Sequence, residues 1–292
     1  MAQFLQVLLS GLATGSIYAL AAVGFSLVWQ AAQAVNFAQG EFVMLPAFLV
    51  LIGEHWLHWP LWAALLFGFA LSILLLGLAF KRLIVQPFGP DGGLPLVIAT
   101  MALSILLKEA VKTFYGAEAE PFPSLIPNGD FHIGGAVISV RDVLNLAAAL
   151  AVVMLLTLFL DRTKTGRQMQ AAAQNPGVAE ILGVDVARMT LYAFLLNAAL
   201  AAVASFLITP VYLAKFSNGE SLGLVAFIAA IIGGFNRIRG ALVGGLLIGV
   251  LDNLTATYVT LSYRAALPLV LLIAVILWRP QGLLGDAEAR IV

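Results

Sequence analysis

Nine stretches of this chain consist almost entirely of apolar residues, and this feature limits its fold more than any other. They are Phe4–Trp29, Phe42–Ile52, Leu61–Phe80, Leu94–Val111, Val143–Leu160, Met189–Tyr212, Leu222–Phe235, Ala241–Tyr258 and Ala265–Trp278. A helix that crosses a bilayer needs about 20 mainly apolar residues. Phe42–Ile52 is too short to cross alone. We therefore expect an all-α, polytopic bundle with eight to nine membrane segments, forming a single transmembrane domain over residues 1–292.

The composition supports a lipid environment. Apolar residues make up 62% of the chain and charged residues only 10%, whereas soluble domains carry roughly 25% charge. The net charge of zero argues against a nucleic-acid partner. The absence of cysteine excludes disulfides and thiolate metal sites. We expect no metal and no cofactor.

The distribution of basic residues predicts the orientation, because cytoplasmic loops collect Lys and Arg. If all nine segments cross, one set of connections holds ten basic residues: Lys81, Arg82, Arg162, Lys164, Arg167, Arg188, Arg237, Arg239, Arg279 and Arg290. The other set holds five: Lys108, Lys112, Arg141, Lys215 and Arg264. The larger set is then cytoplasmic, with the C-terminus inside and the N-terminus outside. If the region of residues 36–52 is re-entrant instead, only the first helix reverses.

Two connections are long. Residues 112–142 face the outside on this topology, and Phe131–Val140 within them has the composition of a short hairpin. Residues 161–188 lie inside. The basic residues at the start of this inner loop indicate, by themselves, only a positive-inside anchor.

The inner loop also contains the signals of a short helix. Asn175 suits the N-cap, Pro176 suits the first helical position, and Gly183 suits the C-terminal stop. The residues that propagate the helix include Ala179, Glu180 and Leu182. Because a helix of about two turns is unstable alone in water, it needs a surface to rest on, in its own bundle or on a partner.

Several motifs resemble the permeases of ABC importers of the branched-chain amino acid type. The inner stretch GRQMQAAAQNPGVAEILGVDVARM is similar to the coupling loop of that family. The remaining motifs occur in the family's order: GLATGSIYALAAVGFSLVW, NFAQGE, GLVAFIAAIIGGFNRIRGALVGGLLIG and WRPQGLLG. The resemblance covers essentially the whole chain. The chain departs from the family pattern at Gln39, where His is common, and at Val225, where Lys is frequent.

The resemblance implies a multi-pass permease subunit of a bacterial inner membrane. Its expected partners are a second permease (related or identical), two cytoplasmic ATP-binding subunits and an extracytoplasmic solute-binding protein. The coupling residues that dock into the ATPase are then Asn175, Pro176, Ala179, Glu180, Leu182 and Gly183. The substrate stays open among branched-chain amino acids, other amino acids, urea, amides and small organic acids.

Two polar interruptions are candidates for the substrate pathway. Asn36, Gln39 and Glu41 form a polar break between apolar segments. Such a break is tolerated at membrane depth only where protein or a water-filled cavity covers it, and it could equally be a surface turn with a solvated Glu41. Asp252 and Asn253 interrupt a later apolar segment. Intramembrane ionisable groups are functional candidates, although Asp252 lies near a predicted outer end where water reaches it.

No enzymatic motif accompanies these features. The chain has no phosphate-binding GxxxxGK sequence, no HExxH and no GxSxG. We therefore expect a transport subunit that is not an enzyme and whose ATPase is a separate chain. The main alternative is a channel or facilitator for a small polar solute such as urea. Such a protein needs no coupling helix, and the long inner loop argues against it.

Overall fold

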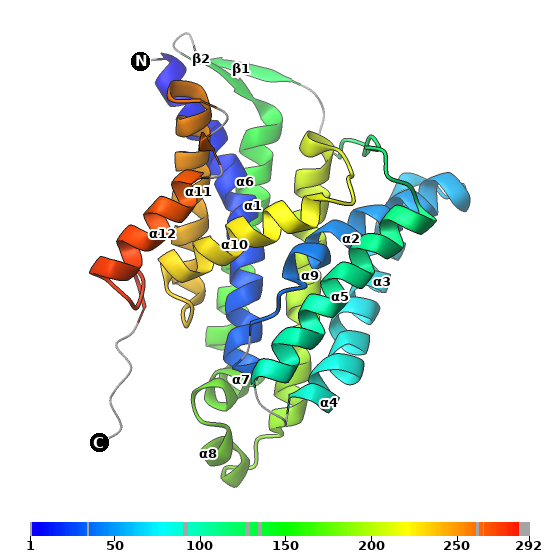
Figure 1. Cartoon of the computed structure of the whole chain (residues 1–292), viewed down its shortest axis with the longest axis vertical. Helices are drawn as coiled ribbons and strands as arrows, with labels where there is room; N and C mark the ends of the chain where they lie inside the picture. Colours follow the sequence, from blue (N-terminus) through cyan, green and yellow to red (C-terminus); the bar gives the residue numbers. More distant parts are fainter. Residues whose placement is uncertain are drawn as a thin grey trace. The chain divides into compact units, whose positions relative to one another are not determined.

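The computed structural model describes residues 2–33, 35–89, 93–125, 129–133, 136–260, 263–264 and 266–285. Helices dominate these residues (Figure 1). The chain divides into two compact units. Unit 1 comprises Met1–Ser26, Leu125–Ala151 and Val225–Val292, and unit 2 comprises Leu27–Ser124 and Val152–Leu224. Each unit is described by itself.

The helices follow the apolar segments closely. Their bounds are α1 Ala2–Ala32, α2 Gln39–Leu51, α3 Leu61–Ser72, α4 Gln86–Phe88, α5 Gly93–Phe114, α6 Val140–Arg162, α7 Lys164–Gln174, α8 Pro176–Ile181, α9 Val186–Tyr212, α10 Asn218–Gly233, α11 Ile238–Tyr258 and α12 Ala266–Trp278. Three π-helical segments, η1 Ile52–Trp56, η2 Ile73–Ala79 and η3 Lys81–Val85, extend α2 and α3. The only strands in the described part are β1 Asp130–Ile133 and β2 Ala136–Ser139.

Six of these helices are long and apolar enough to cross a bilayer: Ala2–Ala32, Leu61–Phe88, Gly93–Phe114, Val140–Arg162, Val186–Tyr212 and Ile238–Tyr258. Helices α10 and α12 are apolar but shorter. The expectation of an all-α, polytopic membrane protein is therefore confirmed. The predicted hairpin also forms, as an antiparallel pair in which Asp130 faces Ser139 and Ile133 faces Ala136.

In unit 2, α2 forms the centre. All of its residues except Leu45 are buried, and it packs against α3, α5 and α9. Gln39 contacts Asn197, and Ala47 contacts Ser205. Since both contacts join residues separated by the same 158 positions, α2 and α9 run parallel. The amide N–H of Ala47, which follows Pro46 inside α2, donates to the Ser205 hydroxyl at 3.1 Å.

In unit 1, glycines bring α1 and α11 into backbone contact. A methyl group added to Gly249 would lie 2.1 Å from the Cα of Gly15, and one added to Gly15 would lie 2.9 Å from the carbonyl oxygen of Gly245. Small residues at such spacing allow close helix packing in lipid. The segment after α12 returns to the end of α10, where the Leu283 N–H donates to the Ile232 carbonyl at 2.8 Å.

Candidate functional site

The polar break between α1 and α2 lies inside unit 2. Asn36, Gln39 and Glu41 are all buried, so the surface-turn interpretation is wrong. Gln39 contacts Asn197, which follows the first residue of α9, Val186, by 11 positions. At 1.5 Å per residue, that places the break about 16 Å along α9. Helix α2 therefore begins part-way along the length of unit 2.

Side chains of neighbouring helices and of the break itself hydrogen-bond to Phe37, Ala38 and Gln39. The Gln39 amide donates to the Asn197 oxygen at 2.7 Å, and the Asn197 amide donates back to the Gln39 oxygen at 2.9 Å. The Thr100 hydroxyl of α5 accepts from the Phe37 N–H at 3.2 Å, and the Asn36 oxygen accepts from the Ala38 N–H at 3.0 Å. The non-helical backbone is thus covered by protein, as membrane depth requires.

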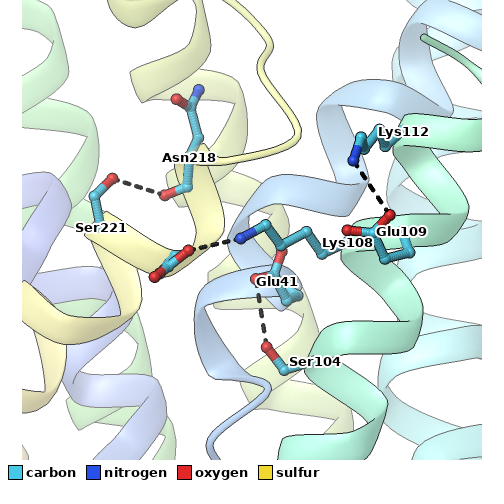
Figure 2. Close-up of polar contacts among 8 residues, drawn as sticks. Glu41, Ser104, Lys108, Glu109, Lys112, Asn218 and Ser221 are labelled. Carbon is cyan, nitrogen blue, oxygen red and sulfur yellow. Dashed lines mark hydrogen bonds and ion pairs between the residues drawn. The ribbon is translucent and has the colours of Figure 1, made fainter. Parts of the chain in front are cut away.

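Glu41 has fewer partners than its burial would lead one to expect. The residue is 2% exposed. The Ser104 hydroxyl donates to its Oε1 at a long 3.4 Å, and Oε2 has no hydrogen-bond partner among the described residues. One turn further along α5, the Lys108 ammonium pairs with the Glu220 carboxylate of α10 at 2.7 Å (Figure 2). The site therefore combines a buried carboxylate with an adjacent, more exposed ion pair.

Glycines allow the first turn of α10 to cover this carboxylate. A methyl group added to Gly219 would lie 2.3 Å from Glu41 Oε2, so any side chain there would clash with the carboxylate. Gly223 and Gly40 also face one another, since a methyl group on Gly223 would lie 2.9 Å from the Gly40 Cα. A carboxylate beside a helix N-terminus is favoured by the helix dipole.

A small pocket lies along α2 just after Glu41, and the Glu41 side chain is not part of its lining. It is lined by Val43, Met44, Ala47, Phe48, Ile208, Thr209, Ala214, Lys215, Asn218 and Leu222. Most of these side chains are apolar, and the polar ones come from the end of α9 and from the segment that leads into α10. The chemistry of the lining suits an aliphatic group next to a polar one.

The second predicted interruption belongs to unit 1. Asp252 is buried, and Arg264 binds it through two hydrogen bonds, of 2.5 Å and 2.6 Å. The Tyr18 hydroxyl donates to the same carboxylate at 3.1 Å. The expectation that water reaches Asp252 was therefore wrong. Asn253 donates to the Gly249 carbonyl of its own helix at 3.1 Å.

The inner loop contains the predicted short helix, α8, at one end of unit 2 (Figure 1). The Asn175 side chain accepts from the Val178 N–H at 3.1 Å, and Pro176 is the first helical residue. Gly183 has a φ of +81°. The Gly183 and Val184 N–H groups donate to the Glu180 and Ala179 carbonyls, at 2.9 Å each. Those two bonds form a Schellman motif, which ends the helix.

The predicted coupling residues of α8 differ in how far they are exposed. Ala179 is 2% exposed and is buried within the chain's own structure, so it does not face a partner. Glu180 is exposed. Ile181 and Leu182 are 85% and 75% exposed. Leu182 follows the last helical residue and is the C-cap.

Helix α7 was not predicted. Its N-cap is Thr163, whose hydroxyl accepts from the Gly166 N–H at 2.9 Å. Gly166, Met169 and Ala172 are buried at a spacing of three residues, and this apolar stripe was the available sequence signal. Gly166 is needed because a methyl group there would lie 2.3 Å from the Phe159 carbonyl oxygen.

Sequence reasoning also missed the partners of the polar break. Asn197, Thr100 and Ser104 lie within apolar segments, where an isolated polar residue is itself a signal. Lys108 pairs with Glu220 in another helix, a contact that spacing along the chain does not reveal. Gly219 and Gly223 are four residues apart, the spacing that indicates close helix packing.

Known proteins resemble this chain along nearly its full length. A family model described as the branched-chain amino acid transport system permease component matches residues 7–276. The high-affinity branched-chain amino acid permease protein BraD of Pseudomonas aeruginosa is 33% identical over 98% of this chain and 97% of its own length. LivH of Escherichia coli K12 is 31% identical over the same shares. The fructose import permease FruG of Bifidobacterium longum is 29% identical over 73% of this chain and 61% of its own length.

Proposed function

This chain belongs to the family of branched-chain amino acid transport system permease components, and we propose that it forms part of the pathway by which an ABC importer moves branched-chain amino acids across a bacterial inner membrane. The similarity to BraD over 98% of the chain carries this proposal. The polar groups around Glu41 and the mostly apolar pocket that follows it along α2 support an amphiphilic substrate.

The proposed assembly contains two permease halves, the second being a related chain or another copy. Two cytoplasmic ATP-binding subunits supply the energy, and an extracytoplasmic solute-binding protein delivers the amino acid. Helix α8 would carry the contact with the ATPase. Its ends are fixed by Asn175 and Gly183, and Ile181 and Leu182 project from it.

The proposed topology has nine membrane segments, with the N-terminus outside and the C-terminus inside. Leu27 and Ala31, near the end of α1, line a pocket together with Met169 of α7 and Met189 at the start of α9. Helix α1 therefore ends beside α7 and the start of α9. Because α2 runs parallel to α9, it ends toward the opposite side. On this basis α1 crosses inward, and residues 33–38 together with α2 cross back.

Reconstitution tests the proposed function. The permease would be purified with its genomically neighbouring permease and ATP-binding proteins and placed in proteoliposomes. We expect ATP hydrolysis and leucine uptake that both depend on a leucine-loaded binding protein. Liposomes with this chain alone should not hydrolyse ATP.

The alternative function, a facilitator for urea, makes a different prediction for the same liposomes. A facilitator would carry urea down its gradient through this chain alone, without ATP. Passive urea flux above that of empty liposomes, together with no ATP-dependent leucine uptake by the full assembly, would reject the importer.

A further inference from the structure

We propose that Glu41 binds the α-ammonium group of the transported amino acid, while the adjacent pocket lined by Val43, Met44, Ile208 and Leu222 receives its aliphatic side chain. The inference rests on the proposed function, and it names the residue that recognises the positive charge of the substrate. It concerns unit 2 alone.

The first support is the unsatisfied state of the Glu41 carboxylate. Buried carboxylates are normally paired or fully hydrogen-bonded, because an unpaired buried charge is costly. Here the only hydrogen bond to it from the described residues is the 3.4 Å bond from Ser104, and Oε2 accepts none. Lys108, the nearest cation on α5, is engaged by Glu220 at 2.7 Å. An ammonium group has three donors and would supply the missing bonds.

The second support is the position of the apolar pocket. Val43 and Met44 follow Glu41 by two and three residues on α2, and Asn218 of the lining precedes Gly219, which packs on the carboxylate. A branched-chain amino acid carries its ammonium group two bonds from its aliphatic side chain. The pocket lining thus begins within one turn of α2 from Glu41, which suits a ligand whose charged group lies close to its aliphatic group.

The third support is the cover over the carboxylate. The first turn of α10 lies directly on Glu41 through Gly219, with no side chain between them. An ammonium group reaches Oε2 only when this turn moves away from α2. At the glycines no side chain holds the two helices together, and the side-chain contact that must shift when this turn moves is the Lys108–Glu220 ion pair.

A purely structural role for Glu41 is the competing explanation. On that view the carboxylate only stabilises the N-terminus of α10 through the helix dipole. Its removal would then lower stability and affect all ligands equally. If Glu41 binds the ammonium group, its removal instead changes the preference between ligands with and without that group. A loss of stability alone does not change this preference.

The test measures binding at the pocket in the assembled complex without the binding protein. Lys215 is exposed at the pocket rim, and the chain has no cysteine, so Lys215→Cys introduces the only thiol of this chain. Maleimide labelling of that thiol is followed by mass spectrometry, in the nucleotide-free and ATP-bound states. Four ligands of one shape are compared: leucine, leucinamide, 4-methylpentanoate and 4-methylpentanamide. At pH 6.5 the ammonium groups of the first two are protonated.

Leucine and leucinamide should slow labelling at concentrations about tenfold lower than the two ligands without an ammonium group, because charge-assisted hydrogen bonds are among the stronger ones. In Glu41→Gln this preference should fall to about twofold or less. Glu41→Asp, which keeps the charge, should retain part of it. Glu109→Gln is the matched control, since Glu109 is half-exposed and pairs only weakly with Lys112 at 3.5 Å.

Three results would overturn the inference while leaving the importer intact. One is equal protection by leucinamide and 4-methylpentanamide in the unsubstituted Glu41 background, which decides the matter even if Glu41→Gln fails to assemble. Another is an unchanged preference in Glu41→Gln. The third is the absence of leucine protection in both states while leucine import proceeds. Failure of ATP-driven leucine import itself would instead contradict the proposed function.

Discussion

Gly40 of α2 and Gly219 of α10 meet backbone to backbone: a methyl group added to Gly40 would lie 2.0 Å from the Gly219 carbonyl oxygen. No real methyl group tolerates such a distance, and the obstacle is backbone, which cannot rotate away. The contact lies next to the buried Glu41 carboxylate. Helix α2 and the first turn of α10 therefore come this close only because neither glycine has a side chain.

Gly40→Ala should consequently force α10 away from α2. Inserting a methyl group into a packed core typically costs about 1–3 kcal/mol. We expect a lower unfolding temperature of the purified complex. We also expect leucine uptake to fall by about tenfold or more, because the same free-energy cost disfavours the state in which α10 packs over Glu41. Differential scanning fluorimetry and proteoliposome uptake measure the two effects.

Gly93→Ala is the matched control for this substitution. Gly93 is the first residue of α5, and a methyl group there would meet nothing within 4 Å. Unfolding temperature and uptake should both remain at the level of the unsubstituted protein. If Gly40→Ala behaves like Gly93→Ala, the tight contact has no bearing on transport.

The parts of the fold that the sequence predicted depend on local signals. The apolar segments predicted the helices, because comparing the length of a segment with the thickness of a bilayer requires no tertiary information. Asn175, Pro176 and Gly183 predicted the ends of α8 correctly, since an N-cap, a first-position proline and a positive φ are each properties of one residue and its neighbours. Ser217 and Glu220 have the capping-box spacing, another local signal, and α10 begins beside them at Asn218.

The parts that the sequence did not predict depend on contacts between distant residues. Glu41 and Ser104 are 63 positions apart, and Lys108 and Glu220 are 112 apart. Neither pairing follows from periodicity. Similarly, the exposure of Asp252 was inferred from its place near a helix end, whereas Arg264 covers it from the following connection. The roles of these residues in transport stay predictions.

The Asp252–Arg264 pair should contribute to the stability of unit 1. The Asp252 side chain is almost fully buried and Arg264 is partly exposed, so this pair costs less to desolvate than a fully buried one. Removing one partner leaves the other charge uncompensated. We expect Arg264→Ala, which leaves the buried Asp252 carboxylate without its cation, to destabilise the complex by about 1–3 kcal/mol. Asp252→Ala, which leaves the partly exposed Arg264, should destabilise it by less, as measured by thermal unfolding in detergent.

A double-mutant cycle isolates the pair. If the two groups act on each other, the loss in Asp252→Ala/Arg264→Ala should be smaller than the sum of the single losses by at least about 0.5 kcal/mol. Strict additivity would show that each residue acts through other contacts. Tyr18→Phe provides a further comparison, because it removes the hydroxyl that donates to the Asp252 carboxylate at 3.1 Å.

The exposed apolar tip of α8 distinguishes coupling from simple anchoring. Ile181 and Leu182 expose most of their surface, although apolar residues gain by burial. Large apolar side chains exposed together often mark a contact with a partner. If the inner loop only anchored the bundle through its basic residues, these two side chains would be dispensable.

We predict that Ile181→Ser/Leu182→Ser loses substrate-stimulated ATP hydrolysis by about tenfold or more, because a few residues carry most of the energy of a protein contact and this pair would bury most of its apolar surface there. Gly183→Pro should do the same, since proline cannot adopt a φ of +81° or donate the Gly183 N–H to the Glu180 carbonyl. Glu180→Arg, which reverses an exposed charge, should weaken coupling as well. Val211→Ser, at the opposite end of α9, is the matched control for losing an exposed aliphatic group. Unimpaired hydrolysis and uptake by all three α8 variants, at equal expression, would leave the loop as an anchor only.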